Sequence, residues 1–288
     1  MRAYTRLPMA KRAKRATRAP GPAARRGEAG HSDPVHPEIP FKLPRPSPAR
    51  RDRARALLAA LDARYPDATC RLDWSRPHEL LVATILSAQA TDESVNAATP
   101  ALFARFPAPA DLARATPDEI APYIRTIGLW RNKARAVHES MAALVERHGG
   151  EVPRDMEALL ALRGVARKTA NVVLGNCFGI QAGVVVDTHV GRLANRLGLS
   201  RHDDPVKVER DLMSLFPRER WCDLSHLLIF HGRAVCRARG NACGSDAICR
   251  AWCSEAARAA RDAGPGGHPA TRRPRGPRTP APRPRRPA

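Results

Sequence analysis

Apolar residues recur at helical spacing in one segment after another between residues 51 and 236. Almost no segment alternates apolar and polar residues with period two, and residues 183–186 are the best candidate for an extended piece. This periodicity predicts an all-α fold built from about ten short helices. The expected helices are 51–64, one from Pro77, 94–106, 116–124, 133–148, 155–162, 168–177, 188–197, 204–215 and 224–236.

Local residue types predict where several helices begin and end. Thr116 is expected as an N-cap with Pro117 in the first helical position, and Asp111 is expected to cap a short turn. The pair Gly149-Gly150 is expected to end the helix before it.

The net charge of +21 lies mainly in two tails. Residues 1–50 hold 12 Lys/Arg against 3 acids, and residues 257–288 hold 9 Arg against 1 acid, which leaves only +4 on residues 51–256. Both tails are rich in proline and lack apolar periodicity, which predicts disorder. Such arms either attract phosphate backbones without sequence preference or only keep the protein in solution. Met9 is a candidate for a later translation start.

The composition favours a bacterial cytoplasmic protein. No apolar run approaches the length of a membrane span, and the basic N-terminus lacks the apolar stretch of a secretory signal. A mitochondrial transit peptide is the alternative for an arginine-rich N-terminus. The same Arg, Ala and Pro bias runs through the whole chain, however, as in GC-rich bacterial coding.

The segment around Gly164 predicts two helices joined by a tight turn. Gly164 is suited to the left-handed conformation that ends a helix, and Val165 is expected to pack inward. Free amides in such a turn and at the start of the next helix bind phosphate, so a helix-hairpin-helix recognises the DNA backbone and not the bases. The residues expected to contact DNA in this way are Gly164, Val165, Ala166, Arg167 and Thr169.

Lys168 is one of only three lysines between residues 51 and 256, with Lys133 and Lys207. A lysine amine can act as a nucleophile, whereas arginine stays protonated. The local sequence leaves two readings of Lys168, a catalytic amine or a lysine that contacts phosphate at the surface. Asp187 is either the N-cap of the next helix or a carboxylate that assists proton transfer and stabilises a cationic sugar, and these two roles are compatible.

Four of the seven cysteines lie close together near the end of the predicted helical region. In an intracellular protein such a loop is more typical of a metal site than of disulfides, and both zinc and a [4Fe–4S] cluster accept four thiolates. The four are Cys236, Cys243, Cys249 and Cys253. The other three, Cys70, Cys177 and Cys222, have apolar neighbours and are expected as buried thiols.

Several separated segments together resemble the endonuclease III family of DNA base-excision glycosylases, and the match covers about residues 51–256. The resemblance implies two helical domains with DNA in a cleft between them. The segments are LLVATILSAQATDESVN at 80–96, YIRTIGLWRNKARAV at 123–137, LRGVARKTANVVLG at 162–175, VVDTHVGRLANRLGL at 185–199 and LIFHGRAVC at 228–236. The implied parts are residues 51–69 plus 154–235 with the hairpin, an inserted helical barrel domain at 70–153, a cluster loop at 236–256, and the tails 1–50 and 257–288.

The resemblance also implies a role for individual residues. Lys168 is implied as the amine that attacks C1′ and forms a Schiff base, with Asp187 as the catalytic aspartate. Gln89 is implied to fill the gap left by an extruded base, and Leu129 to wedge into the opposite strand, because a stacked base must be flipped out before it can react. The alternatives are that Gln89 caps or bridges helices and that Leu129 is a core leucine.

The chain departs from the family pattern in the hairpin and in the cysteine loop. Arg163 stands where proline is usual and Ala166 where glycine is frequent, and neither change affects the lysine chemistry. The family spacing Cys-x6-Cys-x2-Cys-x5-Cys would place cysteines at the positions of Asp246 and Trp252. The resemblance favours a [4Fe–4S] cluster in a rearranged loop over zinc, over oxygen ligation by Asp246 and over a lost site.

The sequence therefore predicts a bifunctional DNA glycosylase/AP lyase that acts on oxidised pyrimidines. Its expected partner is double-stranded DNA with oxidised pyrimidines or abasic sites, bound by a monomer at the bacterial nucleoid. One alternative is a monofunctional glycosylase, such as an adenine-mismatch enzyme, which generally lacks the lysine. Another is a non-catalytic DNA-binding protein, against which the retention of both Lys168 and Asp187 argues.

Overall fold

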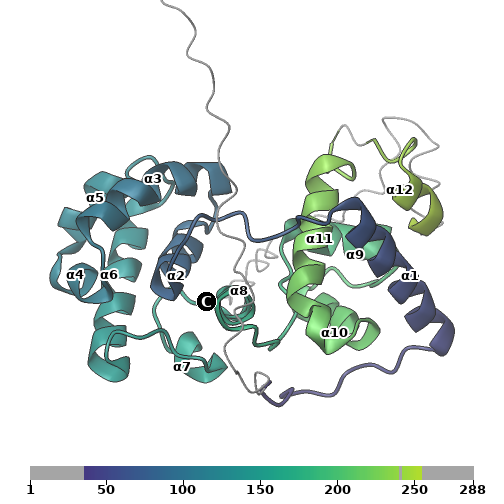
Figure 1. Cartoon of the computed structure of the whole chain (residues 1–288), viewed down its shortest axis with the longest axis horizontal. Coiled ribbons are helices and arrows are strands. Elements are labelled where there is room, and N and C mark those ends of the chain that lie inside the picture. Colours follow the sequence, from purple (N-terminus) through teal and green to yellow (C-terminus); the bar gives the residue numbers. More distant parts are fainter. Residues whose placement is uncertain (1–35, 240–241, 255–288) are drawn as a thin grey trace, which may run out of the picture. The chain divides into compact units, whose positions relative to one another are not determined.

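Every regular element in the described part of the chain is a helix. The computed structural model describes residues 36–239 and 242–254, and Figure 1 shows the arrangement of the helices. The α-helices are α1 (Pro48–Arg64), α2 (Pro77–Leu86), α3 (Asp92–Arg105), α4 (Pro109–Arg114), α5 (Pro117–Ile124), α6 (Trp130–His148), α7 (Met156–Leu160), α8 (Arg167–Phe178), α9 (Thr188–Arg196), α10 (Pro205–Leu215), α11 (Trp221–Ala234) and α12 (Ala247–Trp252), with a 3-10 turn at Arg218–Arg220.

The all-α prediction is confirmed, and residues 183–186 belong to neither a helix nor a strand. Each of the ten predicted helices is present, with ends that differ by a few residues. The sequence did not predict α12, and it indicated α4 only as a short capped turn. Both have six residues, which is too short for a helical repeat to be recognised.

The predicted helix ends follow from capping. The Thr116 hydroxyl accepts from the Glu119 amide at 3.3 Å, and the Glu119 carboxylate accepts from the Thr116 amide at 2.8 Å. Gly149 ends α6 in the left-handed region at φ +60°. Asp111 accepts from the Ala108 amide at 2.9 Å at the start of α4. The caps predicted at Thr116, Gly149 and Asp111 are therefore confirmed.

Buried apolar side chains form two clusters. The first unites α2 to α8, and the second unites α1 with α9 to α12. Helix α8 contacts both α2 and α11 and lies between the two groups in Figure 1. An ion pair also joins them, because Nη2 of Arg233 in α11 lies 2.7 Å from Oδ2 of Asp92 in α3. The division into residues 51–69 plus 154–235 and 70–153 stays a prediction.

Residues 36–47, before α1, pack against the second cluster. The Gln181 amide donates to Nδ1 of His36 at 3.2 Å, and the Phe41 ring contacts the guanidinium groups of Arg167 and Arg210. Of the two predicted tails, residues 1–35 and 257–288 lie outside the described residues, whereas residues 36–50 are described and Pro48–Arg50 begin α1.

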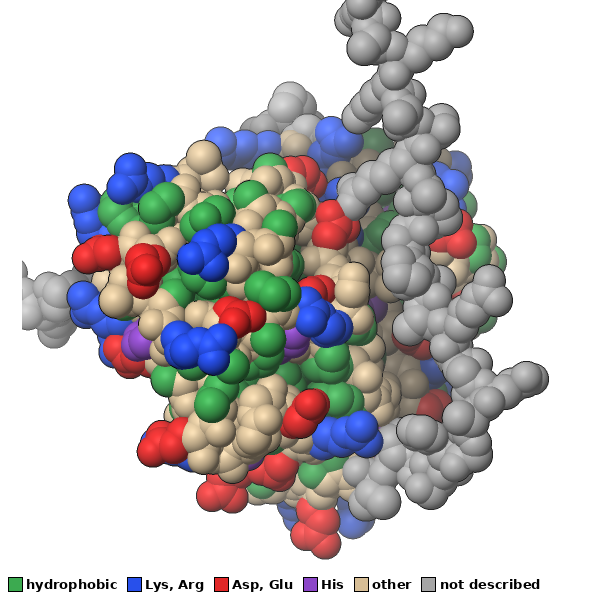
Figure 2. Space-filling view, turned by 60° about the vertical axis from the view of Figure 1, so that its left-hand side comes forward, with side chains coloured by type: hydrophobic (Ala, Val, Ile, Leu, Met, Phe, Trp, Pro, Cys, Tyr) green, Lys and Arg blue, Asp and Glu red, His purple; other side chains and the backbone are tan. Residues whose placement is uncertain are grey.

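The charges of the described surface are mixed. On the face that Figure 2 brings forward, acidic and basic side chains alternate over short distances and form no continuous basic area. This agrees with the near-neutral charge counted for residues 51–256. None of the described helices combines the length and the apolar character that a bilayer span requires.

Candidate functional site

The helical hairpin forms between α7 and α8 as the sequence predicts. Gly164 adopts φ +79°, in the left-handed region, and Val165 is buried. A Cβ added at Gly164 would lie 3.2 Å from Cβ of Ala136 in α6 and 3.5 Å from a methyl carbon of Ile85 in α2. The turn is therefore packed against two helices of the first cluster, and the left-handed φ, together with the tight contact to Ala136, favours glycine there.

The start of α8 presents backbone amides without a side-chain cap. Ala166 is the N-cap residue, and its methyl group cannot accept a hydrogen bond. The first amides of a helix have no partner within the helix, so those of Arg167, Lys168 and Thr169 are available to an anion. The Val165 amide instead donates to the Leu162 carbonyl at 3.2 Å, which leaves it less available than predicted.

Both arginine side chains of the hairpin form ion pairs with acidic residues of the protein itself. Nε of Arg167 lies 3.1 Å from both carboxylate oxygens of buried Glu209, and Nη2 donates to the Ala182 carbonyl at 3.2 Å. Arg163 binds both oxygens of Glu139 at 2.8 and 2.7 Å. The hairpin can therefore offer an anion its backbone amides and Lys168 rather than these two guanidinium groups.

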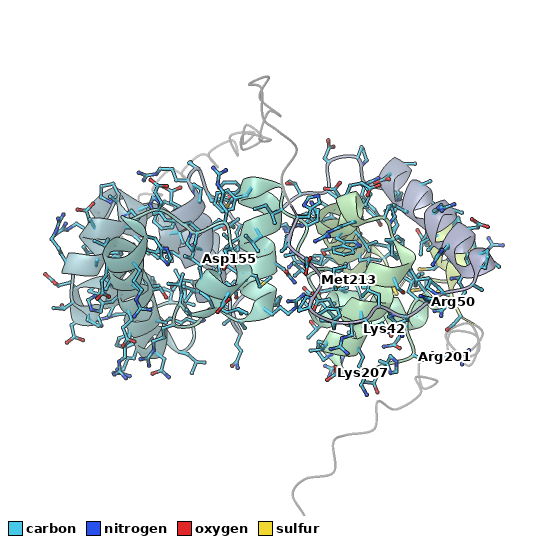
Figure 3. The ribbon with its side chains drawn as sticks, turned by 90° about the horizontal axis from the view of Figure 1, so that it is seen from below. Lys42, Arg50, Asp155, Arg201, Lys207 and Met213 are labelled. Carbon is cyan, nitrogen blue, oxygen red and sulfur yellow. The ribbon has the colours of Figure 1, made fainter. Side chains whose placement is uncertain are left out.

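The three lysines of the helical region lie in different environments. Lys168 is the second residue of α8 and is exposed. Lys133 is only 5% exposed, its Nζ has no hydrogen-bond partner in the described part of the chain, and burial lowers its pKa. Lys207 is exposed at the start of α10 (Figure 3) and does not belong to the hairpin. Only Lys168 combines an accessible amine with the hairpin.

Asp187 is the N-cap of α9. Its Oδ1 accepts from the amides of His189 and Val190, both at 2.8 Å, so the predicted capping role is confirmed. Both bonds use the same oxygen. The cap therefore holds the carboxylate in one orientation and leaves Oδ2 for other chemistry.

The segment that follows α8 returns to the beginning of that helix. A Cβ added at Gly183 would lie 2.0 Å from Oε1 of Glu209 and 2.8 Å from Nδ2 of Asn171, so a larger residue there would displace these side chains. Asn171 also donates to Glu209 at 3.0 Å. Gly183 therefore lies beside Asn171 in the second turn of α8, four residues before Asp187.

Gln89 and Leu129 are the only described residues other than glycine with positive φ, at 54° and 60°. Both are exposed, Leu129 by 57%, and the Gln89 side chain has no hydrogen-bond partner among the described residues. Their turns are adjacent, because a Cβ added at Gly128 would lie 4.0 Å from the Gln89 carbonyl oxygen. The alternatives of a core leucine and of a helix-capping glutamine are wrong. Left-handed backbone at such residues is typical of functional sites.

The four clustered cysteines form a buried group of thiols. The Sγ atoms of Cys236, Cys243 and Cys249 lie within 4.8 Å of one another, and Cys253 is also buried and hydrogen-bonded to Cys249. No disulfide joins any cysteines in the described residues. Hydrogen bonds from Cys243 and Cys249, and a further one from Nη1 of Arg196 at 3.2 Å, hold the pKa of Cys236 well below its usual range. The donor set fits a thiolate-bound cluster.

Asp246 and Trp252 stand where the family spacing would place two cysteines. Asp246 is the N-cap of α12, and its Oδ1 accepts from the Cys249 amide at 2.9 Å. Trp252 is the last residue of α12, and its carbonyl accepts from Arg53 at 2.5 Å. The Asp246 side chain therefore caps α12, and α12 carries Cys249 into the group of thiols. No sequence signal indicated this short helix.

The other cysteines are separate from this group. Cys222 is buried, and Cys70 and Cys177 are half-buried. Burial raises the pKa of Cys70 to about 11 and those of Cys177 and Cys222 to about 12. The expected burial is therefore confirmed for Cys222 and is only partial for Cys70 and Cys177.

Comparison with known proteins shows what the whole chain is similar to. A family model for HhH-GPD superfamily base excision DNA repair proteins matches residues 82–218. Endonuclease III of Synechocystis sp. (strain ATCC 27184 / PCC 6803 / Kazusa) is 54% identical over 196 residues, which are 68% of this chain and 90% of that protein. A non-covalent endonuclease III–DNA complex has a TM-score of 0.68 at 42% identity, covering 71% of this chain and 95% of that one. A trapped endonuclease III–DNA covalent intermediate has a TM-score of 0.67 at 42% identity, covering 71% and 96%.

The fold and the hairpin thus define a helix-hairpin-helix protein of base excision DNA repair. Within that class the chain belongs to the endonuclease III family. Family membership and the buried cysteines together identify the cofactor as a [4Fe–4S] cluster. Cys236 and Cys243, in the loop after α11, and Cys249, in α12, are the residues that would hold it.

Proposed function

We propose that this protein excises oxidised pyrimidines from double-stranded DNA and then cuts the strand at the abasic site, with Lys168 as the nucleophile. The bifunctional glycosylase/AP lyase activity follows from its family. The assignment of Lys168 rests on one observation. The exposed amine of Lys168 lies on the same helical turn as backbone amides that have no acceptor within α8.

The amides of this turn bind a DNA phosphate and bring the sugar next to Lys168. The amine forms a bond to C1′ while the bond from C1′ to the base breaks, and the base leaves with the electron pair. Loss of a proton from the nitrogen and opening of the sugar ring give the imine. Removal of a proton from C2′ then expels the 3′ phosphate, which is the strand cut, and water hydrolyses the imine to release Lys168.

Asp187 serves this sequence through its second carboxylate oxygen. The amides of His189 and Val190 occupy Oδ1, so Oδ2 is the atom that takes up the proton released by the amine and stabilises the cationic sugar. The role as N-cap and the catalytic role therefore use different oxygens of the same group.

Gln89 and Leu129 hold the DNA open around the flipped nucleotide. The Gln89 amide supplies a donor and an acceptor to the orphaned base, and Leu129 enters the opposite strand as an apolar wedge. Their exposure and the proximity of their turns support this assignment. We further propose that the protein acts as a monomer at the bacterial nucleoid, in keeping with its bacterial relatives.

The function is tested with a duplex that carries one thymine glycol and a label on the damaged strand. Wild-type protein should release the base and cut the strand, and Lys168→Gln should do neither while it still binds the duplex. Lys207→Gln, which changes an exposed lysine of α10, is the matched control and should retain full activity. If wild-type protein releases the base without cutting the strand, the result would support a monofunctional glycosylase. If wild-type protein only binds the duplex, the result would support a non-catalytic protein.

A further inference from the structure

His231 is fully buried where three helices meet. Its Nε2 lies 3.3 Å from Sγ of Cys249 in α12, and its Nδ1 lies 2.9 Å from the hydroxyl of Tyr65, the residue that follows α1. His231 itself belongs to α11. One imidazole thus connects α1 and α11 to a proposed cluster ligand.

The direction of both hydrogen bonds follows from the ligand. A metal-bound Cys249 thiolate carries no proton and can only accept, so Nε2 of His231 must donate. A neutral imidazole that carries its proton on Nε2 leaves Nδ1 as an acceptor, and the Tyr65 hydroxyl lies 2.9 Å from that atom. Tyr65 then donates to Nδ1, and burial raises the pKa of Tyr65 so that its hydroxyl keeps the proton.

Asp246 does not compete for this hydrogen bond. Its Oδ1 is 3.9 Å from Nε2 of His231, beyond hydrogen-bond distance, and accepts from the Cys249 amide instead. Cys249 lies three residues after Asp246, about one helical turn further along α12 than the position that the family spacing gives to the third cysteine. This displacement places the Cys249 sulfur against His231.

We propose that the Nε2–H of His231 donates to the sulfur of Cys249 and that Tyr65 and His231 together position this displaced cluster ligand. His231 is a positioning residue, because it touches neither DNA nor a reacting atom. A hydrogen bond to a ligating sulfur stabilises the more negative, reduced form of a cluster and raises its reduction potential. The inference goes beyond the proposed function, since it concerns the cluster and not the lysine chemistry.

The test compares full-length wild-type protein with Tyr65→Phe, His231→Leu and His231→Gln. Iron and sulfide content, visible absorption and the reduction potential measured by voltammetry are the readouts. Tyr65→Phe removes one hydroxyl, and the amide of His231→Gln can still donate to sulfur. His226→Leu is the matched control, because His226 lies in the same helix but bonds to Asn176 and Cys222.

We expect Tyr65→Phe and His231→Leu to shift the potential to lower values, with the larger shift in His231→Leu. His231→Gln should recover part of the shift, and His226→Leu should match wild type. The proposal is overturned if the potential of Tyr65→Phe is unchanged with full iron content, if His226→Leu shifts as far, or if wild-type protein contains no iron and sulfide. If His231→Leu does not fold, the reduction potential of Tyr65→Phe tests the proposal. None of these readouts depends on base release or strand cutting.

Discussion

Arg167 and Glu209 form an ion pair at the first turn of α8, with Nε of the guanidinium 3.1 Å from both carboxylate oxygens. Arg167 directly precedes Lys168, the proposed nucleophile. The Asn171 side chain donates to the same carboxylate at 3.0 Å. The buried Glu209 therefore fixes two residues of α8 on either side of Lys168 in the sequence.

Glu209→Ala should lower the free energy of unfolding by about 3 kcal/mol, because it leaves the partly buried Arg167 and the buried Asn171 without their acceptor. Urea unfolding measures the change. The control is Glu139→Ala, which breaks the more exposed pair with Arg163 and should cost at most about 1 kcal/mol. Equal losses in the two variants would contradict the structural role of Glu209.

Gly164→Ala should weaken binding to undamaged duplex about tenfold, the loss of one good phosphate contact. A Cβ at Gly164 would make a tight contact of 3.2 Å with Cβ of Ala136 and would disfavour the φ of +79° that aims the hairpin amides. Gly149→Ala is the matched control, since Gly149 is also left-handed but a Cβ there meets nothing within 4 Å. Fluorescence anisotropy should show normal affinity for Gly149→Ala, and a similar loss in both variants would exclude a specific role of the hairpin.

Leu129→Gly should stabilise the free protein by about 1 kcal/mol, because glycine adopts the left-handed conformation without strain. The same change removes the wedge, so excision from duplex DNA should fall about tenfold or more. Val206→Ala, which truncates another exposed apolar side chain in α10, should affect neither property. Full duplex activity of Leu129→Gly would rule out the wedge.

The stability of the protein should fall as the pH is lowered from 7 to 5. Burial lowers the pKa of His226 to about 4 in the folded protein, against an ordinary value of 6.5. Between these values the unfolded chain binds the proton and the folded protein does not, so unfolding is favoured as the pH falls; below about 4 both bind it and the effect levels off. His226→Gln should reduce the loss by about 2 kcal/mol over this range, measured as the difference between the two stability curves. Parallel curves would show that His226 titrates normally.

Local chemistry made much of this fold and part of the site predictable. The Thr116 cap, the left-handed Gly149 and Gly164 and the Asp187 cap depend on residues a few positions apart, which a sequence displays directly. Lys168 was distinctive because arginine fills most other basic positions. The exposed position of Lys168 at the start of α8 agrees with the accessible lysine that the sequence predicts beside the hairpin turn.

The remaining features depend on contacts between distant segments. The Arg167 side chain is held by Glu209, 42 residues further on, so the sequence could not reveal that it points into the protein. The left-handed backbone of Gln89 and Leu129 has no residue-type signal, because neither is a glycine. The meeting of Tyr65, His231 and Cys249 requires three helices to pack together.

The central claim is that Lys168 forms a covalent imine with damaged DNA, and borohydride trapping tests it most directly. Wild-type protein incubated with a thymine glycol duplex and reductant should give a protein–DNA adduct, which peptide mass spectrometry should locate at Lys168. Lys168→Gln should give no adduct, and Lys207→Gln should give as much as wild type. An adduct at Lys133 or at the N-terminus, or persistent trapping of Lys168→Gln, would contradict the account.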